Sequence, residues 1–393
     1  MKYCQMQSRN PCRKRRIPGN WKFLVVMRSC FLVLVATAYS STEMREHAKS
    51  PLRVTPRRRE PIDPSQIVLD GSVVGSGTFA TVSSATLVND DSSRQPVVLK
   101  AMLRHRREKL EKVFNREIGI LQDLLDYRDD GAEADHEGRA SIVQLLASFK
   151  DRTHMYLVFE HLGMEIFTLL TDSTNPLHLA DIASILRQTL HALDYCHERQ
   201  IIHCDVKAEN ILFAERGPVQ YGDDGRIINL KIKLIDFGLS KRITDEVRKD
   251  GTFCFLSPEV ILSIPSTAKL DMWGVGHFAY IMRTCRNMFG HVADADYASL
   301  LLMMQKIKRR PLPRSLVMRS AASSVLERGM LIEASDEGGR MQWSINKDIL
   351  CGYGSEPDTA ADGLVDLVHS LMELDPDYRP TAKEALQHPF LNI

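Results

Sequence analysis

The chain has 393 residues, of which 44% are hydrophobic and 26% are charged, a composition typical of a folded protein and not of a disordered one. Its formal charge of +1 conceals an asymmetry. Residues 1–60 carry 14 Lys and Arg against three acids, which leaves 37 Lys and Arg against 47 acids in the rest, a balance of −10. Because phosphate backbones need a basic face, a net acidic body argues against a general nucleic-acid binder, and no nucleic-acid partner is expected.

The eight cysteines indicate neither a metal site nor a disulfide framework. No Cys-x-x-Cys pair occurs, and His and Cys residues do not cluster at the spacing of zinc ligands. Three of the cysteines lie in the first 30 residues, which leaves five, an odd number. These five are expected to be free thiols, mostly buried.

Residues 1–40 have the composition of a targeting segment. A basic run, RKRR at 13–16, precedes an apolar run at 30–35, and no acid occurs before residue 43. The sequence ATA at 36–38 fits the cleavage pattern of a secretory signal peptide, so the secretory pathway is the expected localisation. The alternatives are a mitochondrial transit peptide, a signal-anchor that would tie the chain to a membrane only if it stays uncleaved, and an unprocessed extension on a cytoplasmic or nuclear protein.

The segment 67–88 follows a basic, Pro-rich linker expected over 41–65 and has β-branched residues on both sides of a turn at Gly75 and Gly77. Since a second strand follows the glycines, this segment is predicted to be a β-hairpin, not the strand-to-helix turn of a dinucleotide fold. Such a hairpin can close over phosphates, because glycine lets backbone N–H groups approach an anion. Taken alone, a Gly-x-Gly hairpin is more often a plain turn.

The next predicted strand, QPVVLKAML at 95–103, carries a single charge, Lys100. A lysine in such a strand is either a solvated edge charge or a buried cation with a partner. The segment 107–125 has apolar residues at helical spacing and Glu117 at its centre, so it offers that partner. A pair between Lys100 and Glu117 would hold the ammonium group against nucleotide phosphates.

The chain changes character at Glu160. Residues 126–140 are acidic and are expected to form a surface loop, and two predicted strands then follow, joined by a polar turn at 150–154. We therefore expect an N-terminal lobe over 66–160, a hinge, and a C-terminal lobe over 161–393.

The stretch HCDVKAENIL at 203–212 places an acid, a base and an amide within six residues, after a predicted helix over 179–199. Asp205 on this loop is well placed to accept a hydroxyl proton, while Lys207 neutralises a transferring phosphoryl group. Asn210, together with Asp236 in IKLIDFGLS, would supply oxygen ligands to Mg²⁺.

In their order and spacing these motifs resemble a eukaryotic-type protein kinase over residues 66–393. The resemblance implies an α+β, bilobal fold, with an antiparallel sheet and one helix in the N-terminal lobe and a mainly helical C-terminal lobe. Within the family, the sequences HCD, SPEVIL and LDMWGVG are most similar to the CMGC group, near its dual-specificity tyrosine-regulated, Cdc2-like and SR-protein kinase branch. The matched residues are Gly75, Gly77, Val82, Lys100, Glu117, His203, Asp205, Lys207, Asn210, Asp236, Phe237, Gly238, Ser257, Pro258, Glu259, Asp271, Trp273 and Arg379.

The resemblance implies ATP and Mg²⁺ as cofactors, with Lys100 on the α- and β-phosphates, held by Glu117. Asp236 and Asn210 are then the Mg²⁺ ligands. Asp205 is the proton acceptor, and Lys207 steadies the γ-phosphoryl group. The side chains expected around the adenine ring and the backbone groups expected to bond it are those of Val82, Val98, Leu212, Glu160 and Leu162.

The resemblance also implies contacts and partners. Lys207 is similar to the lysine of kinases that act on Ser and Thr, so protein substrates with those acceptors are expected. The enzyme is also expected to be monomeric. Thr252 should touch Asp205 and Lys207, and Glu259 should pair with Arg379. A hydrophobic column between the lobes is expected from Leu121, Leu145, His203 and Phe237.

Three positions depart from the family pattern, and two rival hypotheses remain. Ala80 replaces the third glycine of the hairpin, Ala208 replaces the common Pro of the catalytic loop, and Cys204 replaces its usual Arg. The first rival is an inactive, ATP-binding kinase fold that acts as a scaffold, but the strand Lys, the loop Asp and the metal Asp are all retained. The second is a secreted kinase similar to the rhoptry type of parasites, suggested by the N-terminal segment.

Overall fold

The computed structural model describes residues 49–52, 62–76, 80–104, 108–125, 137–172, 177–245, 251–290, 292, 296–321 and 359–393. All of them belong to one compact unit, Ala38–Ile393. The predicted targeting segment 1–40, most of the predicted linker and Gly77 lie outside the described residues. Within the described part of the chain, no helix has the length and apolar character needed to cross a membrane.

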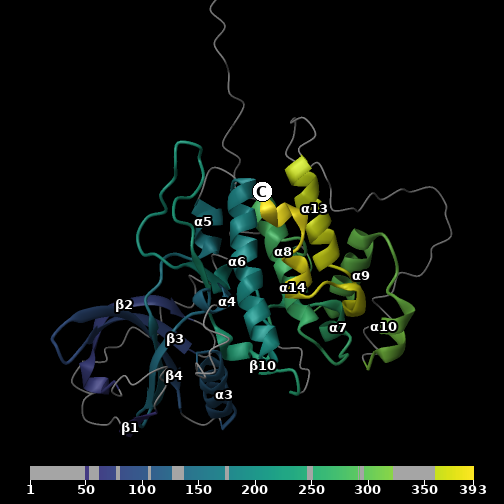
Figure 1. Cartoon of the computed structure of the whole chain (residues 1–393). Helices are drawn as coiled ribbons and strands as arrows, with labels where there is room; N and C mark the ends of the chain where they lie inside the picture. Colours follow the sequence, from purple (N-terminus) through teal and green to yellow (C-terminus); the bar gives the residue numbers. More distant parts are fainter. Residues whose placement is uncertain are drawn as a thin grey trace, which may run out of the picture. The chain divides into compact units, whose positions relative to one another are not determined.

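The N-terminal lobe is an antiparallel sheet with the strand order β1-β5-β6-β4-β3-β2 (Figure 1). β2 and β3 form the predicted hairpin, in which Gly75 lies opposite Val82. β1 lies inside the segment predicted to be a linker, so the linker prediction is corrected for these four residues, which pair with β5. The strands are β1 (Lys49–Leu52), β2 (Ile67–Ser76), β3 (Ala80–Val88), β4 (Arg94–Leu103), β5 (Leu145–Lys150) and β6 (His154–Glu160).

The sheet is stabilised by apolar side chains at every second position of its strands, as the period of a β-strand requires. Ala85 and Leu87 on β3 are buried, and so are Val97 and Leu99 on β4. Phe149 and Tyr156 belong to the same cluster, and their rings stack with centroids 4.8 Å apart. This packing fixes which face of β4 carries Lys100, because Lys100 follows Leu99 and must point to the opposite side.

Helix α3 (Glu108–Leu125) begins one residue after its predicted start. Its buried face carries Phe114, Ile118, Leu121 and Leu125, at the spacing of an amphipathic helix. Glu117 belongs to this face and is 1% exposed, so the helix carries a carboxylate into the interior of the protein.

The prediction of a surface loop over 126–140 is wrong at its C-terminal end. Residues Glu137–Ala140 form the short helix α4, in which Gly138 is buried. A Cβ atom at Gly138 would lie 1.9 Å from the carbonyl oxygen of His191 on α6, so the two backbones touch and only glycine fits there. The rest of that segment, 126–136, lies outside the described residues.

The C-terminal lobe is mainly helical, with two small antiparallel strand pairs (Figure 1). The prediction of a helix over 179–199 is confirmed to within one residue, because α6 ends at Glu198 and Arg199 caps it. The helices are α5 (Ile166–Asp172), α6 (Leu179–Glu198), α7 (Pro258–Ile261), α8 (Lys269–Thr284), α9 (Tyr297–Lys308), α10 (Arg314–Arg319), α13 (Thr359–Leu371) and α14 (Ala382–Ala385). The strand pairs are β7 (Ile201–Ile202) with β10 (Lys241–Arg242), and β8 (Ile211–Phe213) with β9 (Ile232–Leu234).

The cysteines of the described residues carry no disulfide. Cys196 is buried, and Cys204, Cys254 and Cys285 are partly buried, all as free thiols. This agrees with the expectation of free thiols at these four positions.

His277 on α8 provides a test of the packing of the C-terminal lobe, because its imidazole is completely buried. The ring lies 4.4 Å from the ring of Phe255 and 5.1 Å from that of Phe289, and its Nε2 accepts a hydrogen bond of 3.2 Å from the Met288 N–H. Burial lowers the pKa of His277 to about 3. In the unfolded chain this imidazole binds a proton near pH 6.5, so the unfolded state gains the proton first as the pH falls.

We therefore expect His277 to destabilise the fold by about 2 kcal/mol between pH 7 and pH 5, a loss that continues towards pH 3. His277→Gln keeps an acceptor for the Met288 N–H and removes the titration, so its free energy of unfolding should fall less over the same range. Urea unfolding of both proteins at the two pH values measures the difference. Equal pH dependence of the two proteins would contradict a buried neutral imidazole.

Candidate active site

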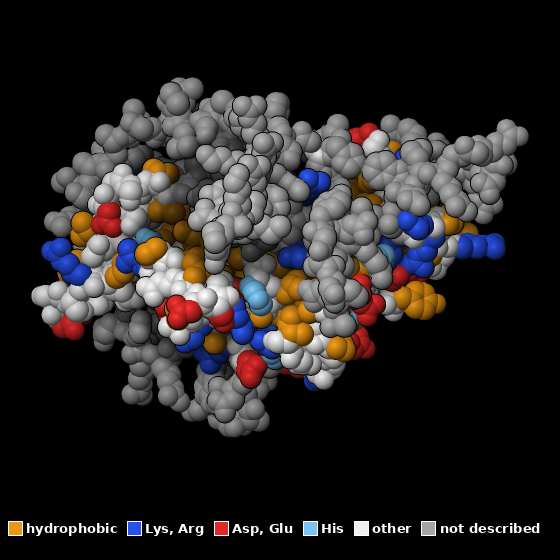
Figure 2. Space-filling model, turned by 90° about the horizontal axis from the view of Figure 1, so that it is seen from above, with side chains coloured by type: hydrophobic (Ala, Val, Ile, Leu, Met, Phe, Trp, Pro, Cys, Tyr) orange, Lys and Arg blue, Asp and Glu red, His pale blue; other side chains and the backbone are white. Residues whose placement is uncertain are grey.

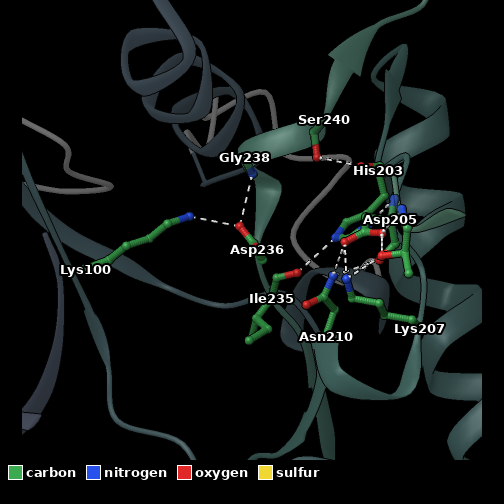
Figure 3. A network of polar contacts seen from close by, with 10 residues as sticks. Lys100, His203, Asp205, Lys207, Asn210, Ile235, Asp236, Gly238 and Ser240 are labelled. Carbon is green, nitrogen blue, oxygen red and sulfur yellow. Dashed lines mark hydrogen bonds and ion pairs between the residues drawn. The ribbon is translucent and has the colours of Figure 1, made fainter. Parts of the chain in front are cut away.

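Lys100 lies between two carboxylates, one in its own lobe and one in the C-terminal lobe. Its Nζ lies 2.8 Å from Glu117 Oε1 on α3 and 2.9 Å from Asp236 Oδ1, beyond β9 (Figure 3 shows the Asp236 contact). Burial alone would lower the pKa of Lys100, but Glu117 and Asp236 outweigh it and raise the pKa, so the side chain stays a cation. The charge of Lys100 in turn holds the pKa of Asp236 at about 2, against the effect of burial. The expected Lys100–Glu117 contact is therefore present, and it includes Asp236 as a third member.

Asp236 has a left-handed backbone, with φ of 62°. Its Oδ1 accepts a hydrogen bond of 3.4 Å from the N–H of Gly238, within the 3-10 turn Phe237–Leu239. Before Asp236 in the chain, the carbonyl oxygen of Ile235 is in contact with Nε2 of His203 at 3.0 Å (Figure 3). Contacts before and after Asp236 thus hold this conformation, which a non-glycine residue rarely adopts.

The structure shows one contact of the expected hydrophobic column between the lobes, that between His203 and Phe237. The ring of Phe237 meets the ring of His203 edge to face, with centroids 4.9 Å apart. All four residues expected in the column are buried, with side chains that are 1% exposed or less: Leu121, Leu145, His203 and Phe237.

Asp205 lies on the loop after β7, and its carboxylate is the centre of a second network (Figure 3). Its Oδ2 lies 2.6 Å from Lys207 Nζ and accepts a hydrogen bond of 3.0 Å from Asn210 Nδ2. Its Oδ1 accepts a hydrogen bond of 2.8 Å from Thr252 Oγ1, and Lys207 Nζ donates to that hydroxyl at 2.7 Å. The predicted contact of Thr252 with Asp205 and Lys207 is thus confirmed. Burial acts to lower the pKa of Lys207, but Asp205 raises it overall, so Lys207 also remains a cation.

Asp271 binds the backbone of the loop that carries Asp205, a role that the sequence motif alone did not reveal. Its two carboxylate oxygens accept hydrogen bonds from the N–H groups of His203, at 2.9 Å, and Cys204, at 2.8 Å. His197, in the last turn of α6, contacts the same carboxylate at 2.8 Å. Burial acts to raise the pKa of Asp271, but the contacts with His197 and His203 lower it overall. No motif pointed to His197, and only its helical position was predictable.

Cys204, which stands where the family pattern has Arg, has a left-handed backbone. Its φ is 70°, in the left-handed region. Burial and the nearby Asp271 carboxylate raise the pKa of its thiol, so the thiol is not an activated nucleophile. The nearby cations are Lys241 and Arg116, which act to lower the pKa of this thiol.

The residues expected around the adenine ring come from three elements. Val82 on β3 lies directly opposite Lys100, and Val98 on β4 precedes Lys100 by two residues, so all three share one face of the sheet. Leu212, on β8 in the other lobe, is partly buried. Glu160 ends β6, and its carboxylate accepts the N–H of Gln144 at 2.7 Å and pairs with Lys233 at 2.8 Å.

The backbone of Leu162 is in the loop that follows β6, and its side chain is 7% exposed. Gly75 is in β2, opposite Val82, whereas Gly77 lies outside the described residues. Val82 and Val98 thus lie next to Lys100 on the sheet, whereas Leu212 comes from β8 of the second lobe. Glu160 and Leu162 lie where the first lobe ends.

The side-chain oxygens of Asp236 and Asn210 are suitable ligands for Mg²⁺. The Nδ2 group of Asn210 donates to the backbone oxygen and the carboxylate of Asp205, which leaves its Oδ1 as an oxygen that accepts no hydrogen bond from the described residues. Asp236 uses Oδ1 for Lys100 and Gly238, which leaves Oδ2 in the same situation. One carboxylate and one amide oxygen suit a hard cation that keeps its waters and bridges phosphates. The described residues contain no cluster of three or more His, Cys, Asp and Glu suited to another metal.

Comparison with known proteins places the chain in a family. The model of the protein kinase domain matches residues 69–391, so the chain belongs to the protein kinase family. The match confirms the expected bilobal α+β fold and the expected class of enzyme.

Three similar proteins are named kinases. The serine/threonine-protein kinase AFC3 of Arabidopsis thaliana is 29% identical over 344 residues, which cover 81% of this chain and 80% of the relative. The dual specificity protein kinase CLK1 of Mus musculus is 28% identical over 257 residues, 63% of this chain and 52% of the relative. The calcium/calmodulin-dependent protein kinase type 1 of Macrobrachium nipponense is 30% identical over 233 residues, 58% of this chain and 60% of the relative. The first two agree with the expected placement near the Cdc2-like branch of the CMGC group.

Proposed function

We propose that this protein transfers the γ-phosphoryl group of ATP to serine and threonine hydroxyl groups of proteins. The observation that carries the proposal is the bridge between Asp205, Thr252 and Lys207, formed beside the contact of Lys100 with Asp236. Five segments far apart in the sequence thereby supply a proton acceptor, two cations and two oxygen ligands to two networks of polar contacts. The similarity to a relative named as a serine/threonine-protein kinase supports the acceptor class.

In this proposal Mg²⁺-ATP supplies the phosphoryl group, and the metal offsets the charge that develops during transfer. Lys100 binds the α- and β-phosphates, and Glu117 keeps its ammonium group in position. Asp236 and Asn210 hold Mg²⁺ through the two oxygens that accept no hydrogen bond from the described residues. Adenine lies against Val82, Val98 and Leu212 and bonds the backbone of Glu160 and Leu162, while the hairpin with Gly75 and Gly77 covers the phosphates.

Asp205 orients the acceptor hydroxyl and takes its proton, and Lys207 neutralises charge on the transferred group. Thr252 fixes both side chains, because its hydroxyl donates to Asp205 and accepts from Lys207. The reaction needs little covalent chemistry from the protein, so positioning and charge stabilisation supply most of the rate.

Lys100→Met tests the proposal, because it removes the phosphate-binding cation and keeps the length of the side chain. We expect it to lower kcat/KM for ATP by about a hundredfold to a thousandfold, the range found when one pre-organised charge contact is lost. Transfer of labelled γ-phosphate to a generic basic protein, with and without Mg²⁺, is the measurement. Lys231→Met, at an exposed lysine on the opposite lobe, is the matched control and should keep full activity.

An inactive scaffold gives a different result in the same experiment. Such a protein would bind ATP, and wild type and Lys100→Met would show the same absence of transfer. Mg²⁺-independent transfer, or equal transfer by the two proteins, would also overturn the proposed roles of Lys100 and Asp236.

A further inference from the structure

Two large hydrophobic side chains stand out on the surface of the C-terminal lobe. Tyr378 is 82% exposed and Met318 is 75% exposed, which makes them the most exposed large hydrophobic residues in the described part of the chain. Single exposed apolar residues are ordinary. These two, however, lie on neighbouring elements, Met318 on α10 and Tyr378 at the end of the 3-10 turn Pro376–Tyr378.

Polar contacts join the two elements into one surface. Ser315 Oγ donates to Asp375 Oδ2 at 2.5 Å, and Arg319 Nη1 pairs with Asp377 Oδ2 at 3.2 Å. Leu316 is fully buried and fixes α10 on the lobe. Arg314 and Met318 are one helical turn apart, so they share the outer face of α10.

This surface has a charge opposite to that of the rest of the folded chain. Residues 306–319 contain six Lys and Arg and no acid, and the adjoining segment 373–378 contains three acids, a surplus of three positive charges. Arg310 pairs with Glu373 and Arg319 with Asp377, whereas Arg314 has no carboxylate partner among the described residues. Figure 2 shows Lys and Arg side chains, with hydrophobic ones beside them, at the right-hand end of the view, where α10 lies in Figure 1.

Lys308, which precedes α10, lies close to other positive charges. Lys308 donates to the carbonyl oxygen of His369 at 2.9 Å, and Glu373 lies 3.8 Å from its Nζ. Burial, with the positive charges of Arg310 and Arg379, lowers the pKa of Lys308 to about 8. An anion that approaches this surface would meet Arg314, which no acid among the described residues neutralises.

We propose that α10 and the turn 376–378 form a docking surface for an acidic segment of a partner protein that also carries a large apolar side chain. Met318 and Tyr378 provide the apolar contact, and both residue types, like Arg, are enriched at protein interfaces. Arg314, which has no carboxylate partner among the described residues, provides the charge that selects acidic partners and speeds their association. The surface lies on α10, away from Lys100 and Asp205, so it would recruit a partner without taking part in phosphoryl transfer.

The test uses the full chain and one defined probe, a fluorescein-labelled peptide of sequence Glu-Asp-Glu-Leu-Glu-Asp-Phe-Glu-Asp-Glu, followed by fluorescence anisotropy. The wild-type protein should bind it, more weakly at high salt than at low salt. Arg314→Glu, and the double change Met318→Ser with Tyr378→Ser, should each weaken binding by about tenfold. Peptides with Lys in place of the acids, or Gly in place of Leu and Phe, should bind less.

Matched variants separate a local effect from a general one. Arg216→Glu makes the same change in net charge at an exposed arginine outside this surface, and Leu103→Ser removes an apolar side chain that is 60% exposed on β4. Both should bind the probe as the wild-type protein does. Thermal unfolding and phosphate transfer to a generic basic protein should be the same in all these variants, because none of the changed residues is in the site around Asp205.

The proposal is overturned if the wild-type protein does not bind the probe, or if Arg314→Glu and Arg216→Glu weaken binding equally. A third result identifies a different occupant. If the probe binds only after Glu333, Asp336 and Glu337 are changed to Ser, the surface is used by that acidic stretch of the chain itself, and no partner protein is needed.

Discussion

Asp205→Asn is expected to lower the rate of phosphoryl transfer by about two to four orders of magnitude, the usual contribution of a positioned proton acceptor. The amide keeps the size of the side chain and one oxygen for the Thr252 hydroxyl, but it does not take up a proton. It also removes the negative charge that lies 2.6 Å from Lys207. Because ATP contacts are assigned to Lys100 and not to Asp205, the KM for ATP should change little. Steady-state kinetics with a protein substrate measures both quantities.

Asp223→Asn is the control for this substitution. Asp223 is exposed, on the loop between β8 and β9, and the same chemical change there should leave both kinetic constants unaltered. A kcat of Asp205→Asn within about tenfold of the wild-type value would show that this carboxylate is not the proton acceptor, since general base catalysis contributes more than that. Unfolding curves of the two variants verify that each is folded.

Arg379→Met is expected to destabilise the protein by about 3–5 kcal/mol, because it leaves a buried carboxylate without its cation. Arg379 and Glu259 have side chains 0% and 1% exposed, and they form two parallel hydrogen bonds of 2.8 and 3.1 Å. Arg379 also donates to the backbone oxygens of Glu373 and Lys269. The predicted pair is thus confirmed, and it joins the start of α7 to the C-terminal part of the lobe. Urea unfolding at pH 7 measures the loss.

The double variant Arg379→Met with Glu259→Leu distinguishes a loss of charge balance from a loss of packing. Since apolar residues often replace a buried ion pair with little cost, the second change should restore part of the stability. A single variant that loses less than about 1 kcal/mol would place this pair among the weak ion pairs of protein surfaces. No recovery in the double variant would instead assign the loss to the contacts with the backbone of Glu373 and Lys269.

Local patterns in the sequence were sufficient for the regular elements near the site. The apolar spacing around Glu117 predicted α3, and the glycines between β-branched runs predicted the hairpin of β2 and β3. Both signals depend on residues a few positions apart, and their period follows directly from helix and strand geometry. Residues without such a period were predicted less well, as β1 and α4 show.

The candidate site was predictable as a set of residues more than as an arrangement. The order of the motifs identified Lys100, Glu117, Asp205, Asn210 and Asp236, but their spacing in sequence gives no contact between them. The role of Asp271 and the contribution of His197 were missed, because a carboxylate that holds the backbone of a loop leaves no pattern beyond its own position.

The sequence by itself thus determined the family, the type of most elements and the residue types brought to the site, since these follow from short-range periodicity and from motif order. The tertiary structure alone decided that Lys100 is shared by carboxylates 17 and 136 residues away, and that Thr252 connects Asp205 and Lys207. It also decided that Met318 and Tyr378 lie on neighbouring elements of one exposed surface. Such contacts depend on how elements pack across the whole chain, and packing is a property of the folded protein and not of any local stretch of its sequence.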